Sequence, residues 1–340
     1  MDRYNIVFVE TEWSCAELLG RKAEDFVLRE FSAFGANVAR IVKEQAYKEE
    51  CMLLPDCVNV VLTLDMPLVK INDITSLAKK MSRDKINCVR LGKSDAIAKI
   101  CMGKDASGGV FSSSQAFLKI DDAKSFNVVY NRLKDEILDN MLALGVRIVD
   151  KNTTFVDDTA IVQSGATILP FTRIEGNSVI SDKSVVGSSY IKDSVIDGAN
   201  VEWSHIVCSC VRARASVGPY ARLRRATIGE DCRVGDFVEV KNSTLENGVK
   251  AAHLSYIGDA AVGERTNVGC GTVFCNYDGK TKHKTTVGCD CFIGANTNLV
   301  APLVVGDKAF IAAGTTVTRD VDEKTFTIGR VRQDTVKSDK

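Results

Sequence analysis

The sequence lacks a net charge, a long apolar run and the layout of a signal peptide. Lysine plus arginine and aspartate plus glutamate both number 44 in 340 residues, so no global charge favours nucleic acid or a membrane surface. No apolar run reaches the roughly 18 residues of a membrane span. The N-terminal stretch MDRYNIVFVETEW has no basic, apolar and small segments in that order. We expect a cytoplasmic protein without nucleic-acid or membrane partners, whose local clusters hold any anionic ligand.

Zinc-type cysteine spacing is also missing, and histidine is scarce. The twelve cysteines are scattered, and the close pairs Cys208/Cys210 and Cys289/Cys291 have one residue between them. That spacing argues against a structural zinc site, and reduced thiols fit a cytoplasmic protein. The three histidines are His205, His253 and His283. Because imidazole titrates near neutrality, they are the natural candidates for a catalytic base.

What the sequence does contain is a period of six from about residue 155. The first ladder consists of Val156, Val162, Ile168, Ile174, Ile180 and Val186, and three more ladders follow within 228–317. Six matches neither the 3.6 period of a helix nor the 2 of a strand, but it fits a short strand plus a turn. This pattern predicts a parallel β-helix with three faces per coil, with roughly nine coils of about eighteen residues over 155–320.

One insertion interrupts the period near the C-terminus. Between Phe274 and Val287 lies CNYDGKTKHKTT, which carries Lys280, Lys282 and His283. A loop that projects from a regular rod is a frequent place for functional residues. A basic loop can equally be a solvated surface segment.

The first part of the chain has a different pattern. CVNVVLTLDMPLV predicts a buried strand with a proline turn, INDITSLAKKM a helix capped by Asn72 or Asp73, and NRLKDEILDNMLALG a second helix. Alternating strands and helices indicate a small α/β layer domain. We predict an α/β domain over 1–125, a linker helix over 126–146, a β-helix over 147–320 and a tail over 321–340.

Rods of this kind often carry acyltransferases, but function has to be argued from residues. Transfer of an acyl group from a thioester to an amine needs a base, oxyanion donors and cations for the phosphates of the carrier. His253 lies in the regular part of the rod, close to Tyr256 and one coil from Asn267. It is the candidate base, and the alternative is a merely structural or exposed histidine.

Longer motifs carry a family resemblance. They are VGPYARLR, VGDFVEVKNST, KAAHLSYIGDAAVGERTNVGCGTVFCNYDGKTKHKTTVG, FIGANTNLVAPLVVGDKAFIAAGTTVTRDV and RVRQ. Residues 217–332 resemble the acetyltransferase half of the bacterial bifunctional glucosamine-1-phosphate N-acetyltransferase and N-acetylglucosamine-1-phosphate uridyltransferase family, and 146–216 are similar in layout. The resemblance implies a left-handed parallel β-helix behind a reduced α/β domain. It also implies metal-free acetylation of glucosamine 1-phosphate, or a close amino sugar phosphate, by acetyl-CoA in cell-wall precursor synthesis, in a homotrimer with its sites between subunits.

The resemblance also implies roles for individual residues. His253 matches the general base. The substrate-binding positions are Arg224, Lys241, Tyr256 and Asn267, to which we add Lys282 of the basic loop, and the acetyl-CoA positions are Cys270, Asn276, Tyr277, Ala295, Ala313 and Arg330. Three features depart from the family: Cys270 replaces alanine, Ala295 replaces serine, and the usual Pro-Gly after Arg224 is absent.

The first domain is similar to the uridyltransferase half of the same family, but reduced. TLDMPLV places Asp65 where that family binds magnesium, whereas VVYNRL has Tyr130 in place of the second ligand, an asparagine. The stretch VFVETEWSCAELLG replaces the glycine-rich nucleotide loop and has no glycine before Gly20, so it offers no close backbone approach to a triphosphate. We predict that uridyl transfer is lost. The alternatives are acetylation of a different amino sugar, or a non-catalytic regulatory paralogue that binds nucleotide sugar or a sibling enzyme.

Overall fold

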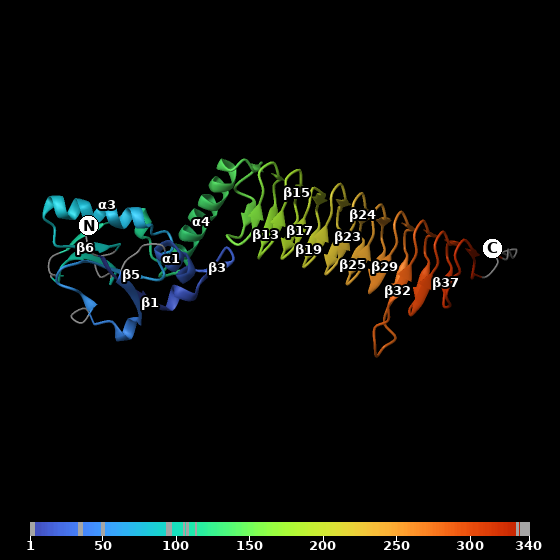
Figure 1. Cartoon of the computed structure of the whole chain (residues 1–340), viewed down its shortest axis with the longest axis horizontal. Helices are drawn as coiled ribbons and strands as arrows, with labels where there is room; N and C mark the ends of the chain where they lie inside the picture. Colours follow the sequence, from blue (N-terminus) through green and yellow to red (C-terminus); the bar gives the residue numbers. More distant parts are fainter. Residues whose placement is uncertain are drawn as a thin grey trace, which may run out of the picture. The chain divides into compact units, whose positions relative to one another are not determined.

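The computed structural model describes residues 4–32, 37–48, 52–92, 97–104, 106, 109–112, 114–330 and 333. It divides into two compact units, Met1–Ile137 and Leu138–Lys340 (Figure 1). The boundary falls within one long helix, α4 (Ala123–Ala143). Most of the tail beyond residue 330 lies outside the described residues. Among the described residues, no helix is long and apolar enough to cross a membrane.

The first unit is built on a six-stranded mixed sheet. The strands lie in the order β4 (Asn37–Lys43), β1 (Tyr4–Glu10), β5 (Val58–Thr63), β7 (Lys99–Met102), β6 (Cys88–Leu91) and β8 (Gly109–Ser112). Every residue of β5 is buried, as expected for a central strand covered on both faces. The other elements are η1 (Glu12–Cys15), β2 (Glu17–Leu18), β3 (Arg21–Lys22), α1 (Ala23–Ser32), η2 (Glu44–Ala46), α3 (Ile71–Asp84) and η3 (Gln115–Phe117).

Two helix starts differ from the sequence prediction. α3 begins at Ile71, so Asn72 and Asp73 lie inside its first turn, and the Asp73 carboxylate accepts the Lys70 backbone N–H at 3.1 Å. α4 begins at Ala123, several residues before the predicted start, because Asp122 accepts the Ser125 N–H at 2.6 Å. The first residue of each helix therefore depends on a side-chain hydrogen bond, which the spacing of apolar residues does not predict.

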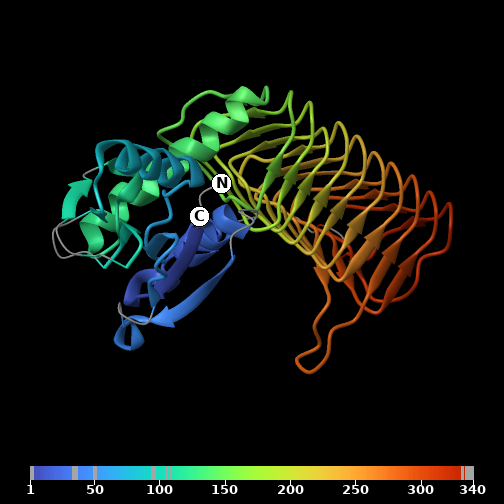
Figure 2. The same cartoon turned by 60° about the vertical axis from the view of Figure 1, so that its left-hand side comes forward.

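The second unit is a rod of stacked coils with three parallel sheets, and each coil gives one strand to each sheet (Figure 2). Face 1 contains β10 (Thr154–Val156), β13 (Thr172–Glu175), β16 (Tyr190–Lys192), β19 (His205–Val207), β22 (Arg222–Arg224), β25 (Glu239–Lys241), β28 (Tyr256–Gly258), β31 (Val273–Cys275), β34 (Asn298–Val300) and β37 (Thr316–Val317). Face 2 contains β11 (Ile161–Val162), β14 (Val179–Ile180), β17 (Val195–Ile196), β20 (Cys210–Val211), β23 (Thr227–Ile228), β26 (Thr244–Leu245), β29 (Ala260–Val262), β32 (Thr285–Val287) and β35 (Leu303–Val305). Face 3 contains β9 (Arg147–Ile148), β12 (Thr167–Ile168), β15 (Val185–Gly187), β18 (Asn200–Glu202), β21 (Ser216–Val217), β24 (Arg233–Asp236), β27 (Lys250–His253), β30 (Asn267–Val268), β33 (Phe292–Ile293), β36 (Phe310–Ile311) and β38 (Phe326–Thr327).

The parallel β-helix predicted from the period of six is confirmed, with its aliphatic ladders as the core. The ladder residues Ile168, Ile174 and Ile180 are fully buried. Face 3 has eleven strands, so the rod has about eleven turns over 147–327, against the nine predicted over 155–320. The additional turns lie outside the predicted range, because β9 begins at Arg147 and β38 ends at Thr327. Individual coils differ in length, and Val186 pairs with Val201 only fifteen residues further on.

Buried hydroxyls satisfy the corners of the short coils. Ser204 donates to the Glu202 carbonyl at 2.7 Å and accepts the Ala221 N–H of the next coil at 3.3 Å. Ser209 makes the same pair of contacts, with Val207 and Ala226. Because buried backbone groups need partners, a small hydroxyl residue suits these positions.

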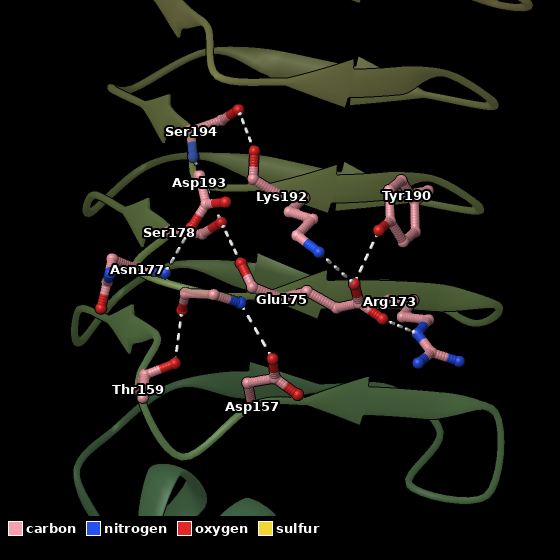
Figure 3. A network of polar contacts seen from close by, with 11 residues as sticks. Asp157, Thr159, Arg173, Glu175, Asn177, Ser178, Tyr190, Lys192, Asp193 and Ser194 are labelled. Carbon is pink, nitrogen blue, oxygen red and sulfur yellow. Dashed lines mark hydrogen bonds and ion pairs between the residues drawn. The ribbon is translucent and has the colours of Figure 1, made fainter. Parts of the chain in front are cut away.

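Charged side chains connect neighbouring coils on face 1 (Figure 3). The Glu175 carboxylate accepts the Tyr190 hydroxyl at 2.6 Å, pairs with Arg173 at 2.5 Å and lies 3.8 Å from Lys192. This hydrogen bond with Glu175, the largest cause, raises the pKa of Tyr190 to about 12. Tyr190 and Lys192 thus connect their coil to the preceding one through Glu175.

Candidate active site on the rod

His253 lies at the corner that leads from face 3 to face 1, which we call the 3–1 corner. It is the last residue of β27, is exposed, and pairs with Asp236 of the preceding coil. Its ring makes no hydrogen bond to another described residue. A side chain in this position is available to a ligand.

The predicted acetyl-CoA positions Cys270, Ala295 and Ala313 form a row along the same corner. The register stacks Ala251, Val268, Ile293 and Ile311, and His253 and the three row positions each lie two residues after one of these. Successive coils are about 4.8 Å apart, so His253 stands one coil from Cys270. The coils approach closely here, since a Cβ on Gly294 would lie 2.4 Å from the Ala313 nitrogen.

Arg330 closes this row at its C-terminal end. Its Nη1 donates to the Ala313 carbonyl, and its Cδ lies 3.9 Å from where a Cβ on Gly314 would be. The guanidinium is exposed. The row therefore runs from an imidazole at one end to a cation at the other, with small side chains between.

A second group, of cations, lies on face 1 near its corner with face 2, the 1–2 corner. Arg224 and Lys241 are direct neighbours on β22 and β25. Lys282 of the inserted loop faces Lys241, and its contact and positive charge lower the pKa of Lys241. Arg224 pairs with Glu239 but its buried Nε has no partner. Cations that crowd together without enough anions are typical of a phosphate site.

Tyr256 and Asn276 meet across face 1. The Asn276 amide donates to the Tyr256 hydroxyl at 3.4 Å and to the Asp259 carboxylate. Tyr277 begins the loop, where its hydroxyl donates to the Gly279 carbonyl at 2.8 Å. The predicted residues Tyr256, Asn276 and Tyr277 thus form one continuous region.

The inserted loop projects from the rod between β31 and β32 (Figure 1) and is held by Asp278. The His283 ring contacts the Asp278 carboxylate at 2.7 Å, and Thr281 N–H donates to it at 2.7 Å. These contacts hold the pKa of Asp278 well below its usual range. The His283 side chain therefore stabilises the loop through Asp278, while Lys282 remains exposed.

Within one chain the predicted base and the predicted phosphate-binding cations lie in two separate groups. His253 and the row with Arg330 lie at the 3–1 corner, and Asn267 lies on face 3 beside Lys250 and Phe292. Arg224, Lys241 and Lys282 lie toward the 1–2 corner. The width of face 1 separates the predicted base from the predicted phosphate site.

Comparisons with known proteins agree with the motifs. The family "Bacterial transferase hexapeptide (six repeats)" matches residues 284–319. "Bifunctional protein GlmU" of Clostridioides difficile is 39% identical over 241 residues, which is 69% of this chain and 52% of that protein. That of Staphylococcus haemolyticus is 47% identical over 192 residues, 56% of this chain and 43% of that protein. The chain is a relative of the bifunctional GlmU proteins.

The chain spans about half the length of the GlmU proteins it matches. Among solved structures, a UDP-N-acetylglucosamine acyltransferase from Campylobacter jejuni is 14% identical, with 51% of this chain and 70% of that chain covered and a TM-score of 0.32. A TM-score of this size adds nothing to the assignment. The relationship rests on the sequence identity to the GlmU proteins.

Four residues that sequence reasoning did not single out support Asn276 and Arg224. Arg225, Asn242 and Asp259 form a column of side-chain hydrogen bonds that ends at Asn276, and each step spans seventeen residues. Glu239 pairs with Arg224. The seventeen-residue spacing, one coil, is a signal that could have found the column.

The described residues around Asp65 form a poor set of ligands for a divalent cation, although Asp65 Oδ1 is buried without a hydrogen-bond partner. The Asp65 side chain is fully buried, accepts the Thr11 hydroxyl, and has the Lys119 ammonium 3.6 Å from its Oδ2. Burial, the largest cause, raises the pKa of Asp65. No three His, Cys, Asp or Glu side chains gather as metal ligands in the part of the chain that the structure describes. The Lys119 ammonium stands beside the carboxylate as its counter-ion.

Proposed function

We propose that this chain is an acetyl-CoA-dependent N-acetyltransferase for glucosamine 1-phosphate or a close amino sugar phosphate, in the synthesis of UDP-N-acetylglucosamine for the cell wall. One observation carries the proposal: His253 and the row Cys270, Ala295, Ala313 and Arg330 share the 3–1 corner. A base next to an extended row of small side chains that ends in a cation suits an acetyl thioester on a long phosphorylated carrier.

In this proposal His253 removes a proton from the acceptor ammonium, and the free amine attacks the thioester carbonyl. The C–N bond forms as the C–S bond breaks, and the thiolate of CoA takes up a proton as it leaves. Arg224, Lys241 and Lys282 hold the acceptor phosphate, and Arg330 holds phosphates of the carrier. No metal takes part.

The width of face 1 between His253 and the cations favours a site completed by a second copy of the chain. Exposed apolar side chains along the 3–1 corner favour the same arrangement: Trp203, Tyr220 and Phe237 are 48%, 55% and 63% exposed. We propose a cytoplasmic homotrimer in which one copy supplies His253 and another supplies the cations.

The direct test is CoA release from acetyl-CoA by the purified chain with glucosamine 1-phosphate and a panel of other amino sugars. Release that is fastest with glucosamine 1-phosphate is the expected result. Faster release with another amino sugar would favour the alternative acceptor, which the altered segment after Arg224 supports. Absence of release with every sugar would favour a regulatory paralogue, which Ala295 and the Lys119–Asp65 pair support.

The cation group predicts an unusual pH dependence of acceptor binding. Since Lys282 lowers the pKa of Lys241, Lys241 loses its charge at a lower pH than an ordinary lysine, and the KM for the acceptor rises from that pH upward. In Lys282→Met the Lys241 pKa returns toward its ordinary range. The rise in KM then moves to higher pH, while KM at neutral pH increases about tenfold through loss of one charged contact.

Steady-state kinetics against pH measure this effect, with Lys183→Met, between β14 and β15, as the charge-matched control. The control removes an exposed lysine from outside the predicted site and should reproduce the parent profile. If Lys282→Met and Lys183→Met have the same KM profile, the assignment of Lys282 to the acceptor site is wrong.

A further inference from the structure

The hydrogen-bonded column at the 1–2 corner ends at a residue of the candidate site. Arg225 Nε donates to Asn242 Oδ1 at 2.7 Å, and Asn242 Nδ2 donates to Asp259 Oδ1 at 3.1 Å. Asp259 Oδ2 in turn accepts Asn276 Nδ2. Both carboxylate oxygens of Asp259 are therefore occupied, one by each neighbouring coil.

The backbone holds these side chains in the same way on each coil. Arg225, Asn242 and Asp259 each follow a face 1 strand and have φ angles of +49°, +48° and +50°. Asparagine and aspartate tolerate this left-handed region better than most residues. Because all three share one backbone conformation, their side chains leave the corner in parallel and meet the next coil.

The chemistry of Asp259 fixes which way the Asn276 amide points. An ionised carboxylate can only accept hydrogen bonds, so the group that faces Asp259 must be the NH₂ of Asn276. Its second hydrogen is directed to the Tyr256 hydroxyl at 3.4 Å. The Asn276 Oδ1 has no hydrogen-bond partner among the described residues. It is also not one of the polar atoms that are fully buried without such a partner. It is the one polar atom of this side chain left for a ligand.

We propose that Asp259 is a positioning residue that turns the Asn276 carbonyl oxygen toward the ligand, so that Asn276 acts only as an acceptor for a ligand N–H. The inference rests on the proposed function. The N–H belongs either to the amine of the acceptor sugar or to an amide of the CoA arm. Asn276 on this assignment does not donate to the oxyanion, because its hydrogens are already used.

Arg225 has a supporting part in the same column. It stands where the sequence lacks the Pro-Gly that usually follows Arg224 in the resembling family. Its bond to Asn242 holds the Asn242 amide with its NH₂ toward Asp259. This contact helps to keep Asp259 in place.

The test is Asp259→Asn, which keeps the size of the side chain but can donate as well as accept. The Asn276 amide is then free to turn over, and the contact with the ligand N–H is lost in about half of the molecules or more. We expect kcat/KM for one of the two substrates to fall about twofold or more, with an unchanged melting temperature. A fall for the amino sugar identifies its amine, and a fall for acetyl-CoA identifies the CoA arm.

Asp193→Asn is the matched control. Asp193 follows the face 1 strand β16, has a φ of +47°, and accepts the Asn177 N–H at 3.0 Å, but it lies outside the candidate site. It should leave both kcat/KM values unchanged. If Asp259→Asn behaves like Asp193→Asn, the inference is wrong even though the parent enzyme is active.

A charge-conserving exchange separates positioning from folding. In the double variant Asp259→Asn with Asn276→Asp, the new amide at 259 donates to a carboxylate at 276, which offers only acceptor oxygens to the ligand. Activity should recover toward the parent. Failure of this rescue, with each variant folded, would show that Asn276 acts as a donor.

Binding measurements keep the inference testable if the proposed acetyl transfer fails. Calorimetric titration with acetyl-CoA and with glucosamine 1-phosphate gives a Kd for the parent and for Asp259→Asn. A weaker Kd for one ligand in the variant supports the positioning of Asn276 without turnover. Equal Kd values in the two proteins, or no binding to the parent, would overturn it.

Discussion

Replacing His253 with alanine is expected to lower turnover by roughly 10²–10⁴-fold, the range typical of a general base, with little change in either KM. The reason is position: His253 is exposed and unbonded, and lies one coil from the row of predicted acetyl-CoA positions. The substitution removes the group that takes the ammonium proton and leaves the phosphate-binding cations in place. Turnover per folded molecule, from CoA release, is the measurement.

His205→Ala is the matched control for this result. His205 is also an exposed rod histidine, but it stacks on Tyr190 with ring centroids 4.7 Å apart and lies three coils before His253. Its loss should leave turnover unchanged. A purely structural His253 would give the opposite pattern, with a lower melting temperature and normal turnover per folded molecule. That outcome would end its assignment as the base.

The fold could be predicted from the sequence because one property, the aliphatic period, determines it. Residues such as Ile168 and Ile174 point into a narrow axis and are fully buried, so their spacing reports the coil directly. The limits of the rod could not be predicted as well. The strands β9 and β38 at its two ends lie outside the aliphatic ladders, so the period of six does not report them.

The candidate site was predictable only in part, for a similar reason. His253, Arg224 and Lys241 were found from the motifs around them. Asp259 and Asn242 were missed because their importance comes from side-chain bonds between coils. Such bonds are invisible until the register is known, since residues seventeen apart become neighbours only when the coil length is seventeen.

We also expect the first unit to have no uridyltransferase activity. We expect no UDP-N-acetylglucosamine from UTP and N-acetylglucosamine 1-phosphate, with or without magnesium. Three features support this expectation. Lys119 stands 3.6 Å from the buried Asp65 carboxylate, Tyr130 packs beside Phe126 in α4 with ring centroids 6.0 Å apart, and the connection after β1 has no glycine before Gly20.

Pyrophosphate release by the pure protein measures this activity, and Asp65→Asn is the control that identifies its origin. With the Lys119 ammonium against Asp65, magnesium would have to displace a cation that is part of the fold, and a triphosphate would meet side chains where close backbone contact is needed. Parent and Asp65→Asn should therefore give the same background. Magnesium-dependent release by the parent that disappears in Asp65→Asn would show that the first unit still catalyses uridyl transfer, with Asp65 free to take the metal in place of Lys119.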